Sequence, residues 1–444
     1  MFPDQGSKSS RLFERALKVM PGGNSRHTVY FPPYPIYAAS AQGARVTDVD
    51  GVTRLDFINN YSSLIHGHCH PEVTEAIQRQ AARLTAISLP TESEIELAEI
   101  ICERLPSVEQ VRFANSGTEG VMMAIKTARA YTGRRIIAKI EGAYHGGDDT
   151  AAVSTYPHPA KLAEPEAGIG IPEVGSGPGT AADVLVLQMN DVEGGRKLLR
   201  AHGAELAAVL VDPLVKNLAY QPASLEFLTM LREETRALGA LLIFDEVYSL
   251  RLGYGGAQEA IGIMADITAM GKIIGGGLPV GAVGGSAEIM SAVYDQRKGK
   301  ARVTHGGTYN ANPLTMAAGV VAMRLFDRAA FDRLSGLGDR LRDGLNQAIA
   351  ATGAHAMVRG AASIVGLFHT VADGATYRDL IRTSMANPGM GAKAETFFHH
   401  MLNNGVLMGA PGFFVLSTAN TEADIDHVVE QAYEAFKIIG KQAA

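Results

Sequence analysis

The chain has 444 residues, of which 46% are hydrophobic and 19% are charged, and its formal net charge at pH 7 is −6. This composition predicts a globular protein with a large core, and the negative charge argues against nucleic acid or an anionic membrane as the main partner. The two cysteines, Cys69 and Cys102, exclude a disulfide framework. No apolar run approaches the roughly 20 residues of a membrane span, and residues 1–20 do not resemble a signal peptide. We therefore expect a cytoplasmic protein.

The N-terminal part is predicted to form a helix followed by a strand meander. Apolar and charged residues alternate at helical spacing from Ser10 to Met20, and Pro21-Gly22-Gly23 ends this helix. Short strands are expected at residues 36–39, 44–48 and 54–58. This antiparallel style differs from that of the rest of the chain, and we assign residues 1–72 to a small domain.

The segment His66-Gly67-His68-Cys69-His70 contains four side chains that could bind a metal. An extended segment of this kind could present alternate side chains to zinc. No second cluster with metal-ligand spacing appears nearby, and Pro71 is predicted to start a helix. We therefore predict no metal site here and expect this loop to pack near the active site.

From Pro71 onward, helices and strands alternate. Helices are predicted at residues 71–84, 93–105, 121–131 and 225–238, and strands at 135–140, 184–187, 207–211, 241–245 and 279–285, with a further strand beginning at Val111. Such alternation predicts a parallel sheet in an α/β domain. Residues 148–179 show no clear period, and we expect them to form a lid over a site.

The last quarter of the chain is predicted to be a separate, smaller α/β unit. Residues 311–326 predict a long helix with apolar residues on several faces, as expected of a connector between domains. Beyond it, helix and strand patterns alternate up to a C-terminal helix at 423–439. The expected domains are therefore a large domain at 73–315 and a C-terminal small domain at 316–444.

Two residues in the predicted large domain suggest chemistry. Asp245 ends an apolar strand, and ligands of open α/β sheets bind at the carboxyl ends of the strands. Lys272 lies between a glycine and a small apolar pair followed by three glycines, so a large ligand can approach it. Such a lysine is a candidate for forming a Schiff base, and an acid facing it suits the ring nitrogen of pyridoxal phosphate (PLP). Taken singly, each is also typical of a helix cap or a solvated loop residue.

Two further segments suit the same cofactor. Ser116-Gly117-Thr118 precedes a predicted helix, whose free N–H groups and dipole form an anion site together with the two hydroxyls. Ordinary helix capping explains this pattern equally well. Tyr144 lies in the glycine-flanked segment 142–147 and could lay its ring on a planar cofactor or, alternatively, cap the sheet edge.

With these motifs in place, the chain resembles the class III (subgroup II) PLP-dependent aminotransferases of fold type I, over nearly its whole length. Within them it is similar to the glutamate-1-semialdehyde aminomutases and the β-amino-acid transaminases. The most specific motifs are Pro21-Gly22-Gly23-Asn24-Ser25, Gly67-His68-Cys69-His70-Pro71, Asn115-Ser116-Gly117-Thr118-Glu119, Tyr144-His145-Gly146, Phe244-Asp245-Glu246-Val247, the stretch from Gly271 to Gly281, and Gly307-Thr308-Tyr309-Asn310-Ala311-Asn312-Pro313.

The resemblance implies an α/β fold of PLP fold type I, with a mainly parallel seven-stranded sheet in a large domain and a smaller α/β domain built from both termini. It implies that Lys272 forms the Schiff base and moves the proton, that Asp245 pairs with the ring nitrogen, and that Val247 and Tyr144 cover opposite ring faces. The other implied cofactor contacts are Ser116, Gly117 and Thr118 at the phosphate, Asn217 at the 3-hydroxyl, and Thr308 at the phosphate of the neighbouring subunit. The last contact implies a homodimer with shared active sites.

The activity implied is transfer of an amino group between an amine or β-amino acid and a keto acid through pyridoxamine phosphate. An intramolecular aminomutase of the glutamate-1-semialdehyde type and an inactive PLP-fold binding protein are the alternatives. Intact Lys272, Asp245 and Tyr144 count against the inactive protein. A nicotinamide oxidoreductase is disfavoured because the three glycines follow Lys272 and do not open a helix after a strand.

Three departures from the family pattern are Asp212 in place of Glu, Gly120 in place of the frequent Ala, and Tyr248-Ser249-Leu250-Arg251 where Gly-Phe-Arg is common. The third lies near the substrate and leaves its identity open.

Substrate contacts are expected from both ends of the chain. Arg26 is predicted to bind a carboxylate, although pairing with a surface acid explains it equally well. Residues 407–414 are apolar and lack the arginine with which many class III enzymes bind 2-oxoglutarate. We therefore expect Met408 and Phe413 to border an apolar group on a substrate with one carboxylate or none, unless Arg251 supplies another cation.

Overall fold

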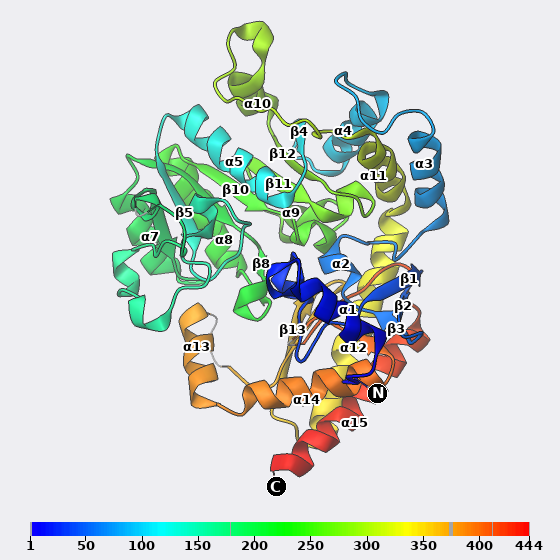
Figure 1. The fold of residues 1–444 in the computed structure, drawn as a ribbon. Helices are drawn as coiled ribbons and strands as arrows, with labels where there is room; N and C mark the ends of the chain where they lie inside the picture. Colours follow the sequence, from blue (N-terminus) through cyan, green and yellow to red (C-terminus); the bar gives the residue numbers. More distant parts are fainter. Residues whose placement is uncertain (1, 178, 373–375, 411, 444) are drawn as a thin grey trace.

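A seven-stranded sheet forms the centre of the larger part of the molecule (Figure 1). The computed structural model describes residues 2–177, 179–372, 376–410 and 412–443. In sheet order the strands are β4 (Gln110–Ala114), β12 (Gly281–Gly285), β11 (Ile267–Gly271), β10 (Leu241–Asp245), β7 (Leu206–Val211), β5 (Ile136–Ile140) and β6 (Val184–Leu187). Strand β12 is antiparallel to both neighbours, and the other adjacent pairs are parallel. The predicted mainly parallel seven-stranded sheet is confirmed.

The sheet is covered on both faces, which explains why its strands are continuous apolar runs. Every residue of β5, β6, β7, β10, β11 and β12 is buried. Because side chains alternate along a strand, Leu242 and Phe244 of β10 enter one core cluster and Leu241 and Ile243 enter another. The first cluster includes α7 (Val192–Ala201) and α8 (Leu225–Leu238), and the second includes α5 (Gly117–Thr132) and α10 (Ala287–Tyr294).

The two ends of the chain join in one smaller sheet. It contains β1 (Ala38–Gln42), β2 (Arg45–Asp48), β3 (Thr53–Asp56) and β15 (Val406–Leu407). Strand β15 runs parallel to β3, with Val406 opposite Leu55. Figure 1 shows the blue N-terminal elements and the orange and red C-terminal elements together below the large sheet. The predicted smaller α/β domain built from both termini is confirmed.

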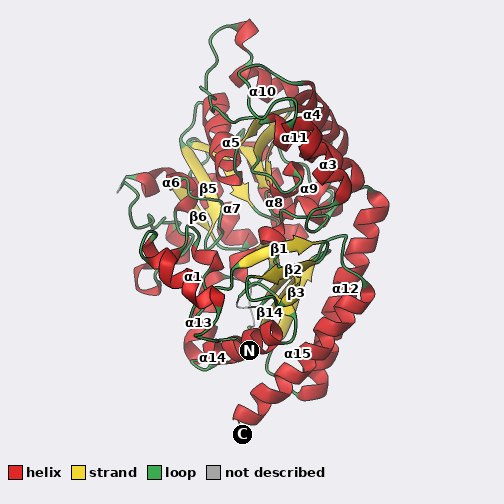
Figure 2. Cartoon of the chain, turned by 45° about the vertical axis from the view of Figure 1, so that its right-hand side comes forward, coloured by secondary structure: helices red, strands yellow, loops and turns green. Residues whose placement is uncertain are grey.

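Helices and a second small sheet complete this lower part. Strands β13 (Met357–Ala361), β14 (Ile364–Phe368) and β16 (Phe413–Val415) form the sheet. Its helices are α12 (Arg328–Thr352), α13 (Tyr377–Ala386), α14 (Met390–Asn403) and α15 (Glu422–Ala443). Helices α12 and α15 pack against each other, as Figure 2 shows at its lower right.

The helix predicted as a connector lies mainly with the large sheet. Helix α11 (Pro313–Leu325) begins after Asn312, whose side chain accepts hydrogen bonds from the first turn. It packs on α3 (Pro71–Ala81), α4 (Glu92–Arg104) and the 3₁₀ helix η8 (Lys272–Gly275). The predicted domain limit at residue 315 therefore falls inside α11. The domain limits stay predictions.

The remaining elements are short or lie at the edges of the two parts. They are α1 (Lys8–Leu17), α2 (Asn59–Ser62), α6 (Asp149–Ala152), β8 (Leu214–Val215), β9 (Gln221–Pro222) and α9 (Gly256–Ile261). Part of the segment predicted as a lid lies along β6, because the N–H of Val186 donates to Gly168 and Ile169 pairs with Leu185. This pairing covers the open edge of the sheet. In the part of the chain that the structure describes, no helix is long and apolar enough to cross a membrane.

The contact between α11 and η8 gives a test of the fold. A Cβ built on Gly319 would lie 2.3 Å from the carbonyl oxygen of Ile274 and 2.9 Å from Leu97. We expect Gly319→Ala to push α11 away from the turn that carries Lys272 and to lower the free energy of unfolding by about 1–3 kcal/mol. The matched control is Gly336→Ala in α12, where a Cβ meets no atom within 4 Å.

The control should be neutral or stabilising by about 0.5–1 kcal/mol, because alanine favours the helix. Denaturant unfolding of both variants measures the difference. Equal stability of the two variants would contradict the close approach of α11 to η8.

Candidate active site

Acidic and basic side chains meet at the carboxyl edge of the large sheet. Asp245 is the last residue of β10, Asp212 follows β7, and Lys272 follows β11, and these three strands are neighbours in the sheet. The carboxyl ends of parallel strands are where ligands of open α/β sheets bind. The structure thus brings together Asp245 and Lys272, as predicted from the sequence.

The amine of Lys272 is free of charged partners among the described residues. Its Nζ lies 5.2 Å from the centroid of the Tyr248 ring. Among the described residues, none forms a hydrogen bond or a salt bridge with this Nζ. Burial lowers the pKa of Lys272, and the charges of Asp245 and Asp212 oppose this effect. A lysine with a lowered pKa is a better nucleophile at neutral pH. Its φ of 49° lies in the left-handed region, where strain often marks a functional position.

Asp245 is held by a histidine that the sequence analysis did not select. The carboxylate is 5% exposed, its Oδ2 lies 2.8 Å from His145 Nδ1, and its Oδ1 accepts a hydrogen bond of 3.0 Å from the N–H of Val247. Burial lowers the pKa of His145 despite the neighbouring charge of Asp245. A neutral imidazole that faces a carboxylate donates from Nδ1, so the pair fixes the tautomer of the ring.

The N-terminus of α5 packs closely against Val247, beside the pair of Asp245 and His145. The helix begins at Gly117, four residues before its predicted start, because Ser116 Oγ accepts a hydrogen bond of 3.2 Å from the N–H of Glu119. A Cβ on Gly117 would lie 2.5 Å from Val247 Cγ1, and one on Gly271 would lie 3.3 Å from the same atom. The absence of side chains at Gly117 and Gly271 therefore lets Val247 pack directly against the first turn of α5 and the end of β11.

Close packing explains why position 120 is glycine and not the frequent alanine. A Cβ there would lie 2.8 Å from the carbonyl oxygen of Ala282, so the departure from the frequent alanine matches a close approach of α5 to β12.

The other predicted cofactor contacts are spread around the edge of the site. Thr118 Oγ1 accepts a long hydrogen bond of 3.4 Å from the N–H of Gly147, and Tyr144 is 55% exposed. Asn217 has a buried amide nitrogen with no partner among the described residues. Thr308 is exposed in a loop tied to the large domain by Asn310, whose Oδ1 accepts 2.8 Å from Asn115 Nδ2.

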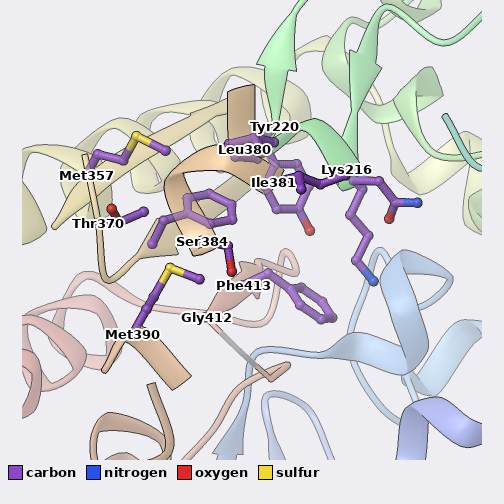
Figure 3. Close-up of a pocket in the computed structure, with 13 residues that line it drawn as sticks. Lys216, Tyr220, Met357, Thr370, Leu380, Ile381, Ser384, Met390, Gly412 and Phe413 are labelled. Carbon is purple, nitrogen blue, oxygen red and sulfur yellow. The ribbon is translucent and has the colours of Figure 1, made fainter. Parts of the chain in front are cut away.

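A cavity of about 330 Å³ lies beside this edge (Figure 3). Its walls are mainly apolar, with Met357, Phe368, Leu380, Ile381, Met390 and Phe413 among the lining residues. Tyr220 also lines it, and its hydroxyl lies 3.4 Å from that of Tyr248, the residue under Lys272. Tyr248 and Tyr220 therefore lie between the reactive amine and the cavity, whose described lining does not include Lys272.

The predicted substrate contacts divide into two groups. Phe413 lines the cavity, and Arg26 is exposed and donates 3.0 Å to Asn60 Oδ1. Met408 is 1% exposed inside the largest core cluster, because it follows β15 on the side that faces the core. Met408 is not among the described residues that line the cavity, and its contact with the substrate stays a prediction.

Arg251 cannot supply the substitute cation. It is fully buried, its Nε donates 2.9 Å to Ser363 Oγ, and its Nη2 donates to the carbonyl of Leu416.

The segment from His66 to His70 is a loop whose side chains have structural partners. His66 lies 2.9 Å from Thr418 Oγ1 and 2.8 Å from the carbonyl oxygen of Ala322, and His68 lies 2.7 Å from Asp56. Across the described residues, no group of three or more His, Cys, Asp or Glu side chains has the geometry of a metal site.

The residues of the sheet edge fit PLP. Its phosphate matches the amides of the first turn of α5, its ring nitrogen matches the buried carboxylate of Asp245, and its aldehyde carbon matches a lysine amine without a charged partner. The unpaired amide nitrogen of Asn217 is a donor that the ring hydroxyl can use.

Comparison with known proteins agrees with this fit. A family model described as aminotransferase class-III matches residues 29–439. The structure of an omega-transaminase from Sphaerobacter thermophilus is 47% identical, with a TM-score of 0.93 over 98% of each chain. A structure described as a transaminase with PLP bound is 41% identical, with a TM-score of 0.89 over 98% of each chain. Glutamate-1-semialdehyde 2,1-aminomutase 2 of Brevibacillus brevis is 38% identical over 97% of this chain and 98% of its own.

The fold and these relatives define a PLP-dependent enzyme of fold type I, with PLP as its cofactor. Within this class, the chain belongs to the class-III aminotransferases.

The buried histidine of the loop gives a test by pH. Burial lowers the pKa of His66 to about 4 from 6.5. Between these values the unfolded chain binds a proton that the folded protein does not, so stability falls as the pH drops from 6.5 toward 4, by about 1.4 kcal/mol per pH unit for this residue. We expect His66→Gln to have a shallower slope in this window, as measured by denaturant unfolding at several pH values. The exposed His27 is the control, and a slope unchanged in His66→Gln would contradict the assignment.

Proposed function

We propose that this enzyme transfers an amino group from an amine or β-amino acid that carries an apolar group to a keto acid. The observation that carries the proposal is the free amine of Lys272 beside Asp245, with Tyr248 and Tyr220 between this amine and an apolar cavity of about 330 Å³. Both residues lie at the sheet edge where ligands bind in this type of fold.

The proposed roles follow from the positions of the side chains. PLP, when bound, supplies the electron sink that lets a C–H bond next to nitrogen be broken. Lys272 Nζ holds the cofactor and moves the proton between carbon atoms, and Asp245, oriented by His145, keeps the ring nitrogen protonated. The remaining proposed contacts are Ser116, Gly117 and Thr118 for the phosphate, Val247 and Tyr144 for the ring faces, and Asn217 for the ring hydroxyl.

The walls of the cavity support a substrate with an apolar substituent. Phe413 and five other apolar side chains line it, and a second carboxylate placed there without a partner would cost several kcal/mol. Arg251 is excluded as its partner by burial, and Arg26 is an exposed cation that donates to Asn60. We therefore propose substrates with one carboxylate or none.

An aminomutase is the second candidate, because Glutamate-1-semialdehyde 2,1-aminomutase 2 of Brevibacillus brevis shares 38% of its residues with this chain over nearly the whole length. Both reactions use the same lysine and aspartate. They differ in whether a separate keto acid is needed. A cytoplasmic location, and the absence of nucleic-acid and membrane partners, stay predictions.

A panel of amines and β-amino acids tests the function. We expect apolar donors to convert the cofactor to its pyridoxamine form and turnover to require an added keto acid, with pyruvate preferred over 2-oxoglutarate. Lys272→Ala should fold and lose turnover by roughly 10²–10⁴-fold or more, because it lacks the proton carrier. The exposed lysine variant Lys197→Ala is the matched control. Turnover of glutamate-1-semialdehyde without a keto acid favours the aminomutase, and multiple turnovers by Lys272→Ala contradict the role of this lysine.

Thr308 gives a separate test of the shared active site. We propose a homodimer in which Thr308, exposed in its own subunit, binds the phosphate in the neighbouring one. Because a hydrogen bond to a charged group contributes about 1.5–3 kcal/mol, Thr308→Ala should weaken cofactor affinity about 10–150-fold while the dimer persists in light scattering. Thr304→Ala, also exposed in this loop, is the control. A monomer with full cofactor occupancy would rule the proposal out.

A further inference from the structure

The apolar cavity has one charged side chain in its described lining, Lys216. This residue belongs to the 3₁₀ helix η6 (Lys216–Leu218), which follows β8 at the carboxyl edge of the large sheet. Figure 3 shows Lys216 on one side of the cavity and the two methionines, Met357 and Met390, on the other. The cavity is therefore cationic at one end and apolar at the other.

Lys216 has no anionic partner among the described residues. Its Nζ lies 4.7 Å from the centroid of the Phe413 ring and 5.4 Å from that of the Tyr61 ring. The faces of aromatic rings attract an ammonium by about 0.5–2 kcal/mol, depending on desolvation. Burial of its surroundings lowers the pKa of Lys216, although the side chain keeps access to solvent. An ammonium held only by ring faces is available to an incoming anion.

A carboxylate binds this ammonium more strongly than the aromatic rings do. Hydrogen bonds between charged groups contribute about 1.5–3 kcal/mol, more than an exposed cation–π contact. A phosphate group carries up to two charges, and one lysine in an otherwise apolar lining would leave the second unpaired. The site therefore suits a monoanion with an apolar body.

Two packed tyrosines and the charge of Lys216 link the cavity to the reaction centre. Tyr220 lines it, the Tyr220 and Tyr248 hydroxyls are 3.4 Å apart, and the Tyr248 ring lies under Lys272. The charge of Lys216 is close enough to Lys272 to contribute to the lowering of its pKa. A protonated amino group is repelled by Lys216, so a substrate carboxylate on Lys216 leaves the amino end toward Lys272.

We propose that Lys216 determines specificity by binding the single carboxylate of a donor whose apolar or aromatic substituent fills this cavity. The proposal rests on the aminotransferase function proposed above and deepens it. It makes Lys216, and not the exposed Arg26, the main partner of the substrate carboxylate.

A matched pair of donors tests the proposal. β-Phenylalanine and the amine in which a methyl group replaces its carboxylate share the amino group and the ring. In Lys216→Met, which keeps the apolar stem, kcat/KM for β-phenylalanine should fall about 10–100-fold, because one charged hydrogen bond is lost, and kcat/KM for the amine should be unchanged or higher. Lys216→Arg should recover most of the loss, and the exposed Lys197→Met is the control.

Binding without turnover separates this proposal from the aminotransferase proposal. Phenylpropanoate and its neutral amide have no amine that could react with PLP. Calorimetry with the PLP-loaded protein therefore measures binding in the cavity without any reaction. Phenylpropanoate affinity should fall at least about 10-fold in Lys216→Met, as expected for a lost charged hydrogen bond, and amide affinity should not. If wild type binds phenylpropanoate but transaminates neither donor, the aminotransferase proposal fails and the cavity assignment stands.

Three outcomes overturn the role of Lys216. The first is an equal loss, in Lys216→Met, of kcat/KM for both donors or of affinity for both phenylpropanoate and its amide. The second is that phenylpropanoate does not bind measurably to wild type, or binds Lys216→Met as tightly as it binds Lys197→Met. The third is a loss selective for the carboxylated ligand in Arg26→Ala but not in Lys216→Met.

Discussion

A buried carboxylate at the end of β10 organises the site. Asp245 is 5% exposed, and its charge is tolerated because His145 Nδ1 and the N–H of Val247 both donate to it. Val247 packs in turn against Gly117 and Gly271, so the residue that donates to the carboxylate also contacts the first turn of α5. Asp212 lies nearby, and burial together with the charge of Asp245 raises its pKa well above the usual value. The raised pKa favours the neutral form of Asp212.

The loop that carries His145 and Tyr144 is held by a second buried charge. Lys139 on β5 is fully buried, and its Nζ donates to the carbonyl oxygens of Ala143 at 3.0 Å, Ala151 at 2.8 Å and Val153 at 2.6 Å. Burial lowers the pKa of Lys139 to about 7. An ammonium that satisfies three carbonyls keeps the end of β5 and the following loop in one conformation. His145 thereby stays in position against Asp245.

The sequence predicted those parts of the site that depend on the order of residues along the chain. Asp245, Lys272 and the turn at Gly117 lie where a strand ends or a helix begins, and apolar runs and glycines mark such points. The parallel α/β sheet followed from the alternation of strands and helices, and its seven strands from the resemblance to the family. The start of α5 was placed four residues late, because the apolar pattern begins only at Val121, whereas Ser116 caps the helix at Gly117. Contacts between distant segments could not be predicted: His145 meets Asp245 across 100 positions, and Lys216 reaches the ring of Phe413. The burial of Met408 could not be predicted for the same reason, since the way its side chain faces depends on how β15 pairs with β3.

We propose that Asp245, oriented by neutral His145, keeps the cofactor ring nitrogen protonated. ¹⁵N NMR of the protein loaded with PLP labelled at that nitrogen measures its protonation directly. We expect the ring nitrogen to be protonated in the wild type across neutral pH and deprotonated in Asp245→Asn, because an amide offers no charge to stabilise the proton. A wild-type nitrogen that is deprotonated at neutral pH, or one that stays protonated in Asp245→Asn, would contradict it.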